Sequence, residues 1–439
     1  MKDYLESLSK EIKGLINLAS TVALNNKVSV YLVGGFVRDL ILGVKNFDLD
    51  IVIEGNGIKF AEDFAMKLKA RIIRHKRFGT ATVMISPVLK VDIATARKES
   101  YPQPASLPVV SKGSLKDDLC RRDFTINAMA LSIAKKKPVR LIDSFGGMQD
   151  LRQKEIRILH QISFIDDPTR ILRAIRFEKR YGFQLEAQTL AALKEAVRLK
   201  MLEKVGEQRL RDEMIIILKE AHPLRQIRRI QELAGFGFIK PKLSLALNNF
   251  KFIGSLENEI NWFKKEFPHH RQFETWLIYF IGLIDPLTIG EAKDLCKRFA
   301  FRREEEKNIS AYKKINKSFI RQLSSPGIKP YDVFRLLKPL TYEVIILLKS
   351  KHRNLNLQKN IKKFFRDYDG AHLYITGDDL HRLGFAPGPD YRRILNKVLE
   401  AKLNGKVKTK KEELAMVISN YLMNGDGLRC QDKRGWRKN

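Results

Sequence analysis

The sequence predicts a fold of the α+β class, with an α/β segment at the start of the chain and an all-helical remainder. Two observations lead to this prediction. Short β-prone runs alternate with helical segments up to about residue 150. From Asp167 onward such runs largely disappear, and apolar residues recur at the spacing of helix faces. The length of 439 residues is too great for one hydrophobic core, so we expect roughly three folding units.

The expected strands of the first segment are short and rich in β-branched residues. They span residues 28–33, 47–53, 81–85 and 90–94. The first ends at Gly34 and Gly35, and the second alternates acidic with apolar positions. The remainder is expected to be helical because apolar residues recur at helical spacing, as in Ile171, Leu172, Ile175 and Phe177, and in Leu210, Met214, Ile217 and Leu218.

The chain is strongly basic. Its 82 Lys and Arg residues against 50 Asp and Glu residues give a net charge of +32. A polyanion such as a nucleic acid is the natural partner for this charge. A generally Lys-rich proteome is the alternative explanation. An acidic membrane surface is less favoured, because no basic amphipathic anchor is evident.

The sequence does not predict a secreted or membrane-spanning protein. The N-terminal residues form a charged amphipathic pattern without a signal-peptide core, and the apolar stretch 276–284 is too short to cross a bilayer. Cys120, Cys296 and Cys430 are far apart and form no CxxC spacing, so neither a disulfide framework nor a zinc site is predicted. We therefore expect a cytoplasmic protein with no membrane partner.

The first candidate site is the turn at Gly34 and Gly35, between an expected strand and a helix. Without a Cβ atom at these positions, backbone N–H groups can approach a phosphate closely. The following helix N-terminus and Arg38 add positive charge. This pattern favours binding of a triphosphate, although a Gly-Gly pair in such a place is more often only a tight connection.

The second candidate site is a set of carboxylates. Asp48 and Asp50 lie two positions apart in an expected strand and therefore share a face, whereas Phe47 and Leu49 point to the other side. Asp92 lies in another short strand and can face the same pocket. Three such carboxylates can hold two Mg²⁺ ions about 3.5–4 Å apart, which is typical of nucleotidyl transfer. An ordinary solvent-facing acidic pair is the alternative.

These residues resemble a known family. Several motifs in order are similar to those of the bacterial-type (class II) tRNA CCA-adding enzymes and poly(A) polymerases, in the polymerase-β-like nucleotidyltransferase superfamily. The resemblance is dense from about residue 28 to 215. The motifs are Gly34-Gly35-Phe-Val-Arg38-Asp39 with Asp48-Leu-Asp50, Arg121-Arg122-Asp123-Phe-Thr-Ile-Asn127, Asp143-Ser-Phe-Gly-Gly147, Asp166-Asp167-Pro-Thr-Arg170-Ile-Leu-Arg173-Ala-Ile-Arg176, and Arg209-Leu-Arg-Asp-Glu213.

The resemblance implies an architecture of head, neck, body and tail. We expect a polymerase-β-like α/β catalytic head in residues 1–150, followed by all-helical domains. These are a neck that selects the base in residues 151–220, a body in residues 221–330, and a tail that binds tRNA in residues 331–439. The tRNA acceptor arm is expected to contact the basic body and tail.

The resemblance also implies roles for the later motifs. Arg122, Asp123 and Asn127 offer donors and acceptors suited to a ribose. In the next motif, an Asp167 acceptor beside an Arg170 donor suits cytosine and adenine and opposes uracil and guanine. Arg173 and Arg176 of this motif are also expected at the nucleotide, together with Gly34, Gly35 and Arg38.

Two features of these motifs have ordinary structural explanations. Asp167 before Pro168 is also a good helix N-cap. Arg209 and Glu213 are spaced as an ion pair on a helix surface, and we assign them a structural role in the neck. One departure is that the family usually has Glu where this chain has Asp166.

Residues 349–366 form a second basic feature and contain no acid. They are either a phosphate-binding stripe or a solvated helix face. The basic residues are Lys349, Lys351, Arg353, Lys359, Lys362, Lys363 and Arg366.

The predicted function is template-independent addition of nucleotides to the 3′ end of tRNA. CTP and ATP are the expected donors, Mg²⁺ is the expected cofactor, and pyrophosphate is released. A poly(A) polymerase is the first alternative, because it shares the head chemistry. A non-catalytic RNA-binding protein is a remote one, since clustered acids give such a protein no advantage. The sequence leaves open whether C and A, or only the terminal A, are added.

Overall fold

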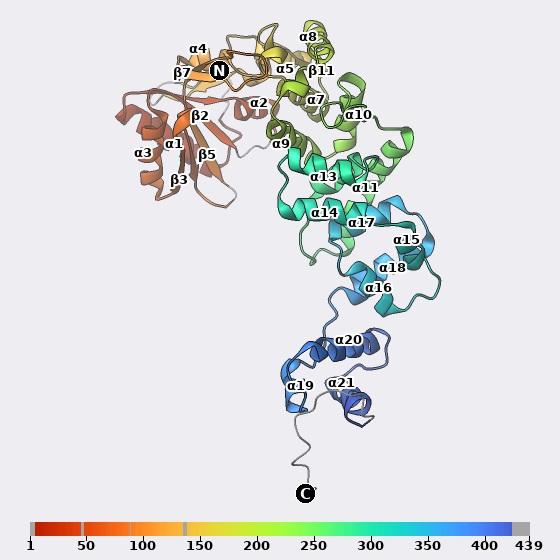
Figure 1. The fold of residues 1–439 in the computed structure, drawn as a ribbon. Coiled ribbons are helices and arrows are strands. Elements are labelled where there is room, and N and C mark those ends of the chain that lie inside the picture. The colour runs from red at the N-terminus through yellow and green to blue at the C-terminus, as the bar shows by residue number, and fades with distance from the viewer. Residues whose placement is uncertain (1–4, 45–47, 88, 135–137, 424–439) are drawn as a thin grey trace. The chain divides into compact units, whose positions relative to one another are not determined.

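The computed structural model describes residues 5–44, 48–87, 89–134 and 138–423, and the chain divides into two compact units, Met1–Ser244 and Leu245–Asn439. The large β-sheet lies in the first unit, whereas the described elements of the second unit are helical (Figure 1). The prediction of an α/β segment followed by helices is therefore confirmed. The finer division at residues 150, 220 and 330 stays a prediction.

The first unit is built on a seven-stranded mixed sheet. Strands β2 and β5 are paired in parallel, and the other neighbours are antiparallel. The order across the sheet is β3 (Arg71–His75), β4 (Thr80–Met84), β5 (Lys90–Thr95), β2 (Leu49–Glu54), β1 (Ser29–Val33), β8 (Ala130–Ser132) and β9 (Arg140–Ile142).

Helices α1 (Lys10–Asn25) and α3 (Gly57–Leu68) pack against this sheet and against each other. Each begins at a polar cap, because the side chains of Ser9 and Asn56 accept hydrogen bonds from the first turns. Their apolar faces are buried, as Phe60 and Phe64 in α3 illustrate. Helix α2 (Gly35–Leu42) follows β1 directly.

The predicted strands are found close to their expected positions, with one difference. Strand β2 begins at Leu49, so Asp48 precedes the strand instead of lying within it. Phe47, expected to point into the core, lies outside the described residues, as does Cys430. The segment after β5 forms a two-stranded ribbon of β6 (Arg97–Ser100) and β7 (Val109–Lys112).

The first unit also contains several short elements. They are the 3₁₀ helices η1 (Lys76–Phe78), η2 (Thr125–Asn127) and η3 (Met201–Lys204), helices α4 (Leu115–Cys120), α5 (Gly147–Gln153) and α6 (Ser163–Asp166), and the parallel pair β10 (Glu155–Ile156) and β11 (Gln184–Leu185).

The longer helices of the first unit are α7 (Thr169–Tyr181), α8 (Ala187–Arg198), α9 (Glu207–Leu218) and α10 (Pro223–Leu233). Helix α7 packs against both α9 and α10. Ile171, Leu172 and Ile175 of α7 are fully buried, as their helical spacing predicts. These contacts place the motif at the start of α7 beside the motif at the start of α9.

The second unit consists of helices among its described residues. They are α11 (Leu247–Glu266), α12 (Thr275–Leu283), α13 (Ile289–Arg298), α14 (Arg303–Lys313), α15 (Lys317–Leu323), α16 (Pro330–Leu337), α17 (Tyr342–Lys351), α18 (Leu355–Lys363), α19 (Gly377–Arg382), α20 (Pro389–Leu403), α21 (Lys410–Val417) and the π-helical segments Phe364–Tyr368 and Ile418–Met423. Within the described ranges, no helix is both long and apolar enough to span a bilayer.

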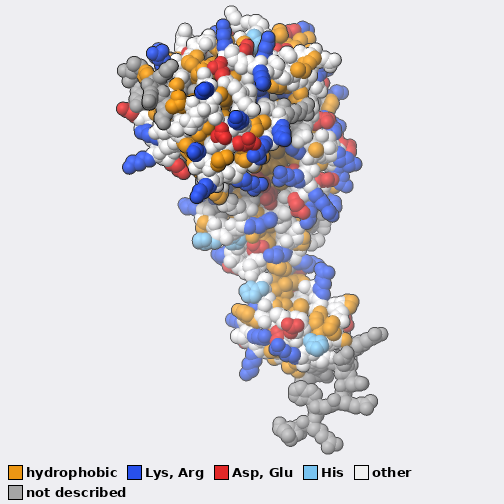
Figure 2. Space-filling model, turned by 90° about the vertical axis from the view of Figure 1, so that its left-hand side faces the viewer, with side chains coloured by type: hydrophobic (Ala, Val, Ile, Leu, Met, Phe, Trp, Pro, Cys, Tyr) orange, Lys and Arg blue, Asp and Glu red, His pale blue; other side chains and the backbone are white. Residues whose placement is uncertain are grey.

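The basic run 349–366 does not form one continuous stripe. It is divided between the end of α17, helix α18 and the π-helical segment. Lys349 is largely buried, where it pairs with Glu259 and lies over the Trp262 ring, and Lys351 pairs with Asp285. On the face drawn in Figure 2, Lys and Arg side chains are spread over the surface instead of gathered in one band.

Candidate active site

The turn after β1 brings an arginine against the backbone of a glycine. Gly34 has a φ of +69°, in a region that L side chains rarely adopt. A Cβ atom at Gly34 would lie 2.5 Å from Nη1 of Arg122 and 3.7 Å from Oδ2 of Asp50. The glycine therefore makes room for the guanidinium group of Arg122 beside the acidic strand.

The structure brings Asp50 and Asp92 together. They are register partners on the parallel strands β2 and β5, so their side chains project from the same face of the sheet. Thr82 donates a hydrogen bond to Oδ1 of Asp92, and Nζ of Lys90 lies 2.7 Å from Oδ2 of the same carboxylate. Asp48 is exposed, directly before β2.

The acidic strand carries concentrated negative charge. The pKa of Asp50 is raised to about 6. Burial is the main cause, and the nearby carboxylates of Asp92 and Asp48 add to it, whereas Arg122 and Lys90 oppose the rise. Oxygen ligands of this kind are those that Mg²⁺ prefers, so the donor set fits this ion. The side chains of the described residues nevertheless include no group of three His, Cys, Asp or Glu already arranged around a metal position.

The acids and the later motifs line one cavity of about 760 Å³. Its lining extends from the start of β2 to helices α7 and α9. Of the sequence-predicted site residues, the lining includes Gly35, Arg38, Asp48, Asp50, Arg122, Asp123, Asn127, Asp167, Arg170, Arg173 and Arg176. Gly34 and Asp92 lie just outside the lining, beside Arg122 and Asp50 respectively.

Asp123 is the centre of a buried network at one side of the cavity. Its Oδ2 accepts hydrogen bonds from Nε and Nη2 of Arg173 at 2.9 and 2.7 Å, and its Oδ1 accepts one from the amide of Asn127 at 2.8 Å. Burial alone raises the pKa of Asp123, but Arg173 and Asn127 outweigh it and lower this pKa to about 2. Asp123 is therefore an anion that joins the second motif to α7.

The network continues from Asn127 to the glycine turn. Nη1 of the buried Arg38 donates to the side-chain oxygen of Asn127, and Arg38 also pairs with Asp39 at 2.8 Å. The Arg38 guanidinium lies 4.7 Å from the ring centroid of Tyr181, whose hydroxyl donates to Asp39. In this structure Arg38 is thus held by protein groups and positions the turn.

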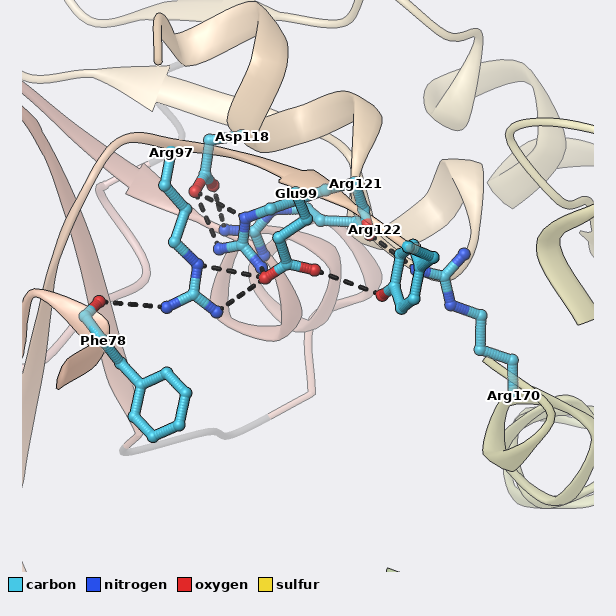
Figure 3. Close-up of polar contacts among 8 residues, drawn as sticks. Phe78, Arg97, Glu99, Asp118, Arg121, Arg122 and Arg170 are labelled. Carbon is cyan, nitrogen blue, oxygen red and sulfur yellow. Dashed lines mark hydrogen bonds and ion pairs between the residues drawn. The ribbon is translucent and has the colours of Figure 1, made fainter. Parts of the chain in front are cut away.

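The guanidinium groups of Arg121 and Arg122 share one buried carboxylate, that of Asp118 (Figure 3). Burial raises the pKa of Asp118, but Arg122 and Arg121 outweigh it and hold this pKa below its usual range. Glu99 of β6 lies between Arg97 and Arg121, with N–O distances of 2.8 and 3.2 Å (Figure 3). These acids fix the orientation of the arginines at the cavity wall.

Asp167 forms hydrogen bonds at the start of α7 and also lines the cavity. Its Oδ1 accepts hydrogen bonds from the backbone N and the hydroxyl of Thr169, which caps the start of α7. The same oxygen lies 2.6 Å from Nη2 of Arg209, and Asp167 lines the cavity. Arg170, also at the cavity, donates to the hydroxyl of Ser163 and to the backbone carbonyl of Arg121.

The expected helix-surface pair of Arg209 and Glu213 is not formed. Arg209 instead pairs with Asp167, and Glu213 lies 3.2 Å from Arg173. Both therefore connect α9 to α7 at the cavity, which sequence spacing alone did not indicate. Asp166, at the position where the family usually has Glu, is not among the lining residues and lies 3.9 Å from His160.

Sequence reasoning missed some residues of the site. Asp118 had no motif signal beyond its position three and four residues before Arg121 and Arg122, a spacing that places acid and base on one helix face. Arg180 and Asp212 line the cavity and belong to α7 and α9, one turn beyond Arg176 and beside Glu213. A systematic reading of these two helix faces would have identified them.

Comparisons with known proteins identify the family of this chain. The profile of the "Poly A polymerase head domain" matches residues 30–157, and that of the "Probable RNA and SrmB- binding site of polymerase A" matches residues 182–247. The A-adding tRNA nucleotidyltransferase of Geobacter sulfurreducens is 37% identical over 89% of this chain and 45% of its own length. That of Aquifex aeolicus is 38% identical over 72% of this chain and 38% of its own length.

The chain thus spans less than half the length of these two curated relatives. A solved structure is similar over its whole length. The Thermotoga maritima CCA-adding enzyme, complexed with tRNA-CCA, is 33% identical and has a TM-score of 0.73, with 95% of this chain and 97% of that chain covered. The chain therefore belongs to the family of tRNA CCA-adding nucleotidyltransferases and poly(A) polymerases.

Proposed function

We propose that this protein is a template-independent nucleotidyltransferase that extends the 3′ end of tRNA, and that the terminal A is among the nucleotides it adds. One observation carries the proposal. A single cavity of about 760 Å³ is lined by the acids Asp48 and Asp50 at one wall and by Asp167 and Arg170 at another. Groups suited to phosphoryl chemistry and groups suited to reading a base therefore meet in one place.

In the proposed reaction, the 3′-hydroxyl oxygen of the tRNA attacks the α-phosphorus of ATP or CTP. A new phosphodiester bond forms, the bond to the bridging oxygen breaks, pyrophosphate leaves and the hydroxyl proton is released. Asp48, Asp50 and Asp92 would hold two Mg²⁺ ions, which would lower the pKa of the attacking hydroxyl and neutralise charge on the leaving group. We assign contact with the triphosphate to Arg122, whose guanidinium group lies beside Gly34.

Asp167 is suited to selection of the base. Its Oδ1 is occupied by Thr169 and Arg209, and its Oδ2 has no hydrogen-bond donor within the described ranges. A free carboxylate oxygen accepts well from the exocyclic amino group of adenine or cytosine, whereas uracil and guanine present a carbonyl oxygen at that position. Arg170 retains further N–H groups for the ring nitrogen. We therefore assign the choice of nucleotide to this pair.

The ribose and the remainder of the nucleotide are assigned to the buried network. Asp123, Asn127 and Arg173 are fixed by mutual hydrogen bonds, and Arg176 of the same helix lines the cavity. Nε of Arg176 is buried and has no hydrogen-bond partner among the described residues. We assign residues 1–150 to the catalytic head, 151–220 to the neck, 221–330 to the body and 331–439 to the tRNA-binding tail.

Two of the curated relatives support addition of the terminal A. The two curated relatives that are 37% and 38% identical are both named A-adding tRNA nucleotidyltransferases. We accordingly expect tRNA ending in CC to be the preferred substrate. The described cysteines Cys120 and Cys296 are free thiols, which supports activity in a reducing compartment such as the cytoplasm.

The test offers the purified protein three tRNA substrates with Mg²⁺. They end before the first C, after one C and after two, and each is incubated with CTP, ATP or both. We expect one A on the CC end and no further growth. An Asp50→Asn variant, purified in the same way, controls for contaminating activity and is expected to be inactive.

Each result has a distinct meaning. Extension of the shorter substrates to a full CCA end would assign C addition to this protein as well. Long A tails on unrelated RNA would establish a poly(A) polymerase instead. Failure of the protein to incorporate ATP into any substrate would refute the proposed function.

A further inference from the structure

A second cavity, of about 540 Å³, lies in the first unit at the end of α7, the end of α9 and the start of α10. Arg180 lines this cavity and also the candidate active site. Glu220 of the second cavity lies 3.7 Å from Arg176 and 3.5 Å from Arg180, so its charge is compensated by the arginines that connect the two sites. The two cavities thus share Arg180 in their linings.

Its electrostatic character is cationic. Lys179, Arg180, Lys219 and Arg225 line it, and Glu220 is the carboxylate in its lining. Lys219 and Arg225 are exposed, and neither pairs with an acid within the described part of the chain. Two side chains are therefore available for an anionic ligand.

A helix N-terminus adds to this charge. Helix α10 has 11 residues and begins at Pro223, and its N-cap residue His222, which lines the cavity, makes no side-chain capping bond to the first turn. The positive end of the helix dipole is therefore not compensated by a cap. Such an end, beside Lys and Arg side chains, favours a phosphate group.

Gln226 supplies an independent observation. Its side chain lines the cavity from the first turns of α10, yet only 3% of the residue is exposed. Its Oε1 is buried and has no hydrogen-bond partner among the described residues. A buried acceptor without a donor is costly, so it indicates a missing donor group. A ribose 2′-hydroxyl, next to a backbone phosphate, is such a donor.

We infer that this second cavity binds a phosphate and its adjoining ribose in the tRNA strand, upstream of the 3′ end that lies in the active site. This inference rests on the proposed function. The base-selecting Arg170 and the shared Arg180 are ten residues apart on one helix, or about 15 Å. If the 3′ end of the RNA strand lies near Arg170, a nucleotide upstream of that end can reach the second cavity. The triphosphate of the incoming nucleotide is not the expected ligand there, because we assign it to the glycine turn.

The test uses full-length protein and tRNA ending in CC. Binding is measured by fluorescence anisotropy at several salt concentrations, for the wild type and for Lys219→Ala/Arg225→Ala. We expect the Kd for tRNA to rise roughly tenfold and the slope of log Kd against log salt to fall by about 1–2, since each phosphate contact contributes about one unit. The Kd for ATP should stay within about twofold.

The matched control is Lys194→Ala/Lys204→Ala, which removes two exposed lysines of the same unit outside the cavity. It changes net charge equally and should leave the salt slope nearly unchanged. Equal losses in both double variants would overturn the inference, because they would show a general charge effect. Weaker ATP binding with unchanged tRNA binding would also overturn it, by assigning the cavity to a free nucleotide.

The role of Gln226 is tested by tRNA with a single 2′-deoxy substitution at each of the last four nucleotides in turn. One of these substitutions should weaken binding to the wild type severalfold and have no effect on a Gln226→Leu variant. If no position discriminates between the two proteins, a ribose hydroxyl is not the missing donor and the inference fails. The proposed function would remain intact in that outcome if the wild-type protein still elongated tRNA normally.

Discussion

Arg209 and Asp167 form an ion pair with 2.6 Å between Nη2 and Oδ1, although they are 42 positions apart in the sequence. The pair connects the start of α9 to the start of α7, where the cavity wall carries Asp167 and Arg170. Because Arg209 and Thr169 both use Oδ1, the carboxylate plane is fixed and Oδ2 remains for a ligand. Arg209 is therefore a positioning residue for Asp167.

We predict that Asp167→Ala and Arg209→Ala both relax the choice of nucleotide. Loss of one base-facing hydrogen bond costs about 1–3 kcal/mol of discrimination, so incorporation of UTP and GTP relative to ATP should rise roughly tenfold to a hundredfold. Arg209→Lys keeps the charge and should restore part of the selectivity. Single-nucleotide incorporation on tRNA ending in CC measures all of these ratios. Unchanged rejection of UTP and GTP would leave Asp167 as a helix cap alone.

A second prediction concerns Asp50 of β2. Asp50→Asn should reduce turnover by roughly 100-fold or more, since even partners in the outer shell of a metal site typically contribute 10–100-fold. The Kd for tRNA should change less than about twofold, because we assign this carboxylate to cations and not to RNA. Rapid-quench kinetics and anisotropy separate the two effects. Wild-type turnover of this variant in Mg²⁺ would contradict the two-metal assignment.

Local sequence patterns predicted the parts of the site that depend on neighbouring residues. The strand, the Gly34 turn and the helix that follows are all specified within about ten positions, and the structure has them there. The facing of Asp50 and Asp92 was also anticipated, since alternation fixes the face of each strand. Pairing of β2 with β5 then brought the two carboxylates into register.

Distant pairings were not predictable in the same way. The i to i+4 spacing of Arg209 and Glu213 is equally compatible with a surface pair and with two separate contacts to another helix. The structure has the second arrangement, with Asp167 and Arg173 as partners. The burial of Lys349 in the basic run 349–366 was not predictable either, because its partner Glu259 is 90 positions away. Only tertiary packing of the helices determines such contacts.

A third prediction tests the close approach at Gly34. Gly34→Ala adds a Cβ atom 2.5 Å from Nη1 of Arg122 and places an L side chain at positive φ. The backbone strain should cost about 1–3 kcal/mol of stability. Displacement of Arg122 should raise the KM for ATP several-fold. Thermal unfolding and steady-state kinetics measure the two effects.

Gly43→Ala is the matched control for this variant. Gly43 also has a positive φ, of +71°, but an added Cβ atom there meets no atom within 4 Å. We expect a loss of about 1–2 kcal/mol of stability with an unchanged KM for ATP. Equal changes of KM in both variants would show that Arg122 is not the cause.

The last prediction concerns pH and the network at Asp123. Its pKa is lowered from the ordinary value of 3.8 to about 2, because Arg173 and Asn127 stabilise the carboxylate more than burial destabilises it. A carboxylate with a depressed folded-state pKa contributes stability above its unfolded-state pKa, and this contribution is lost as pH falls toward the folded-state value. The contribution is about 2 kcal/mol at neutral pH, and about half of it should remain at pH 3. The stability difference between wild type and Asp123→Asn should therefore narrow by about 1 kcal/mol between pH 5 and pH 3.

Tryptophan fluorescence does not report on this unit, since Trp262, Trp276 and Trp436 all lie beyond residue 244. Hydrogen exchange of peptides from α7 and α9, corrected for the intrinsic pH dependence, measures the opening free energy there. Asp212→Asn, which removes an exposed carboxylate from α9, should show no such narrowing. A constant difference between wild type and Asp123→Asn across this pH range would mean that the ion pair with Arg173 does not stabilise the fold.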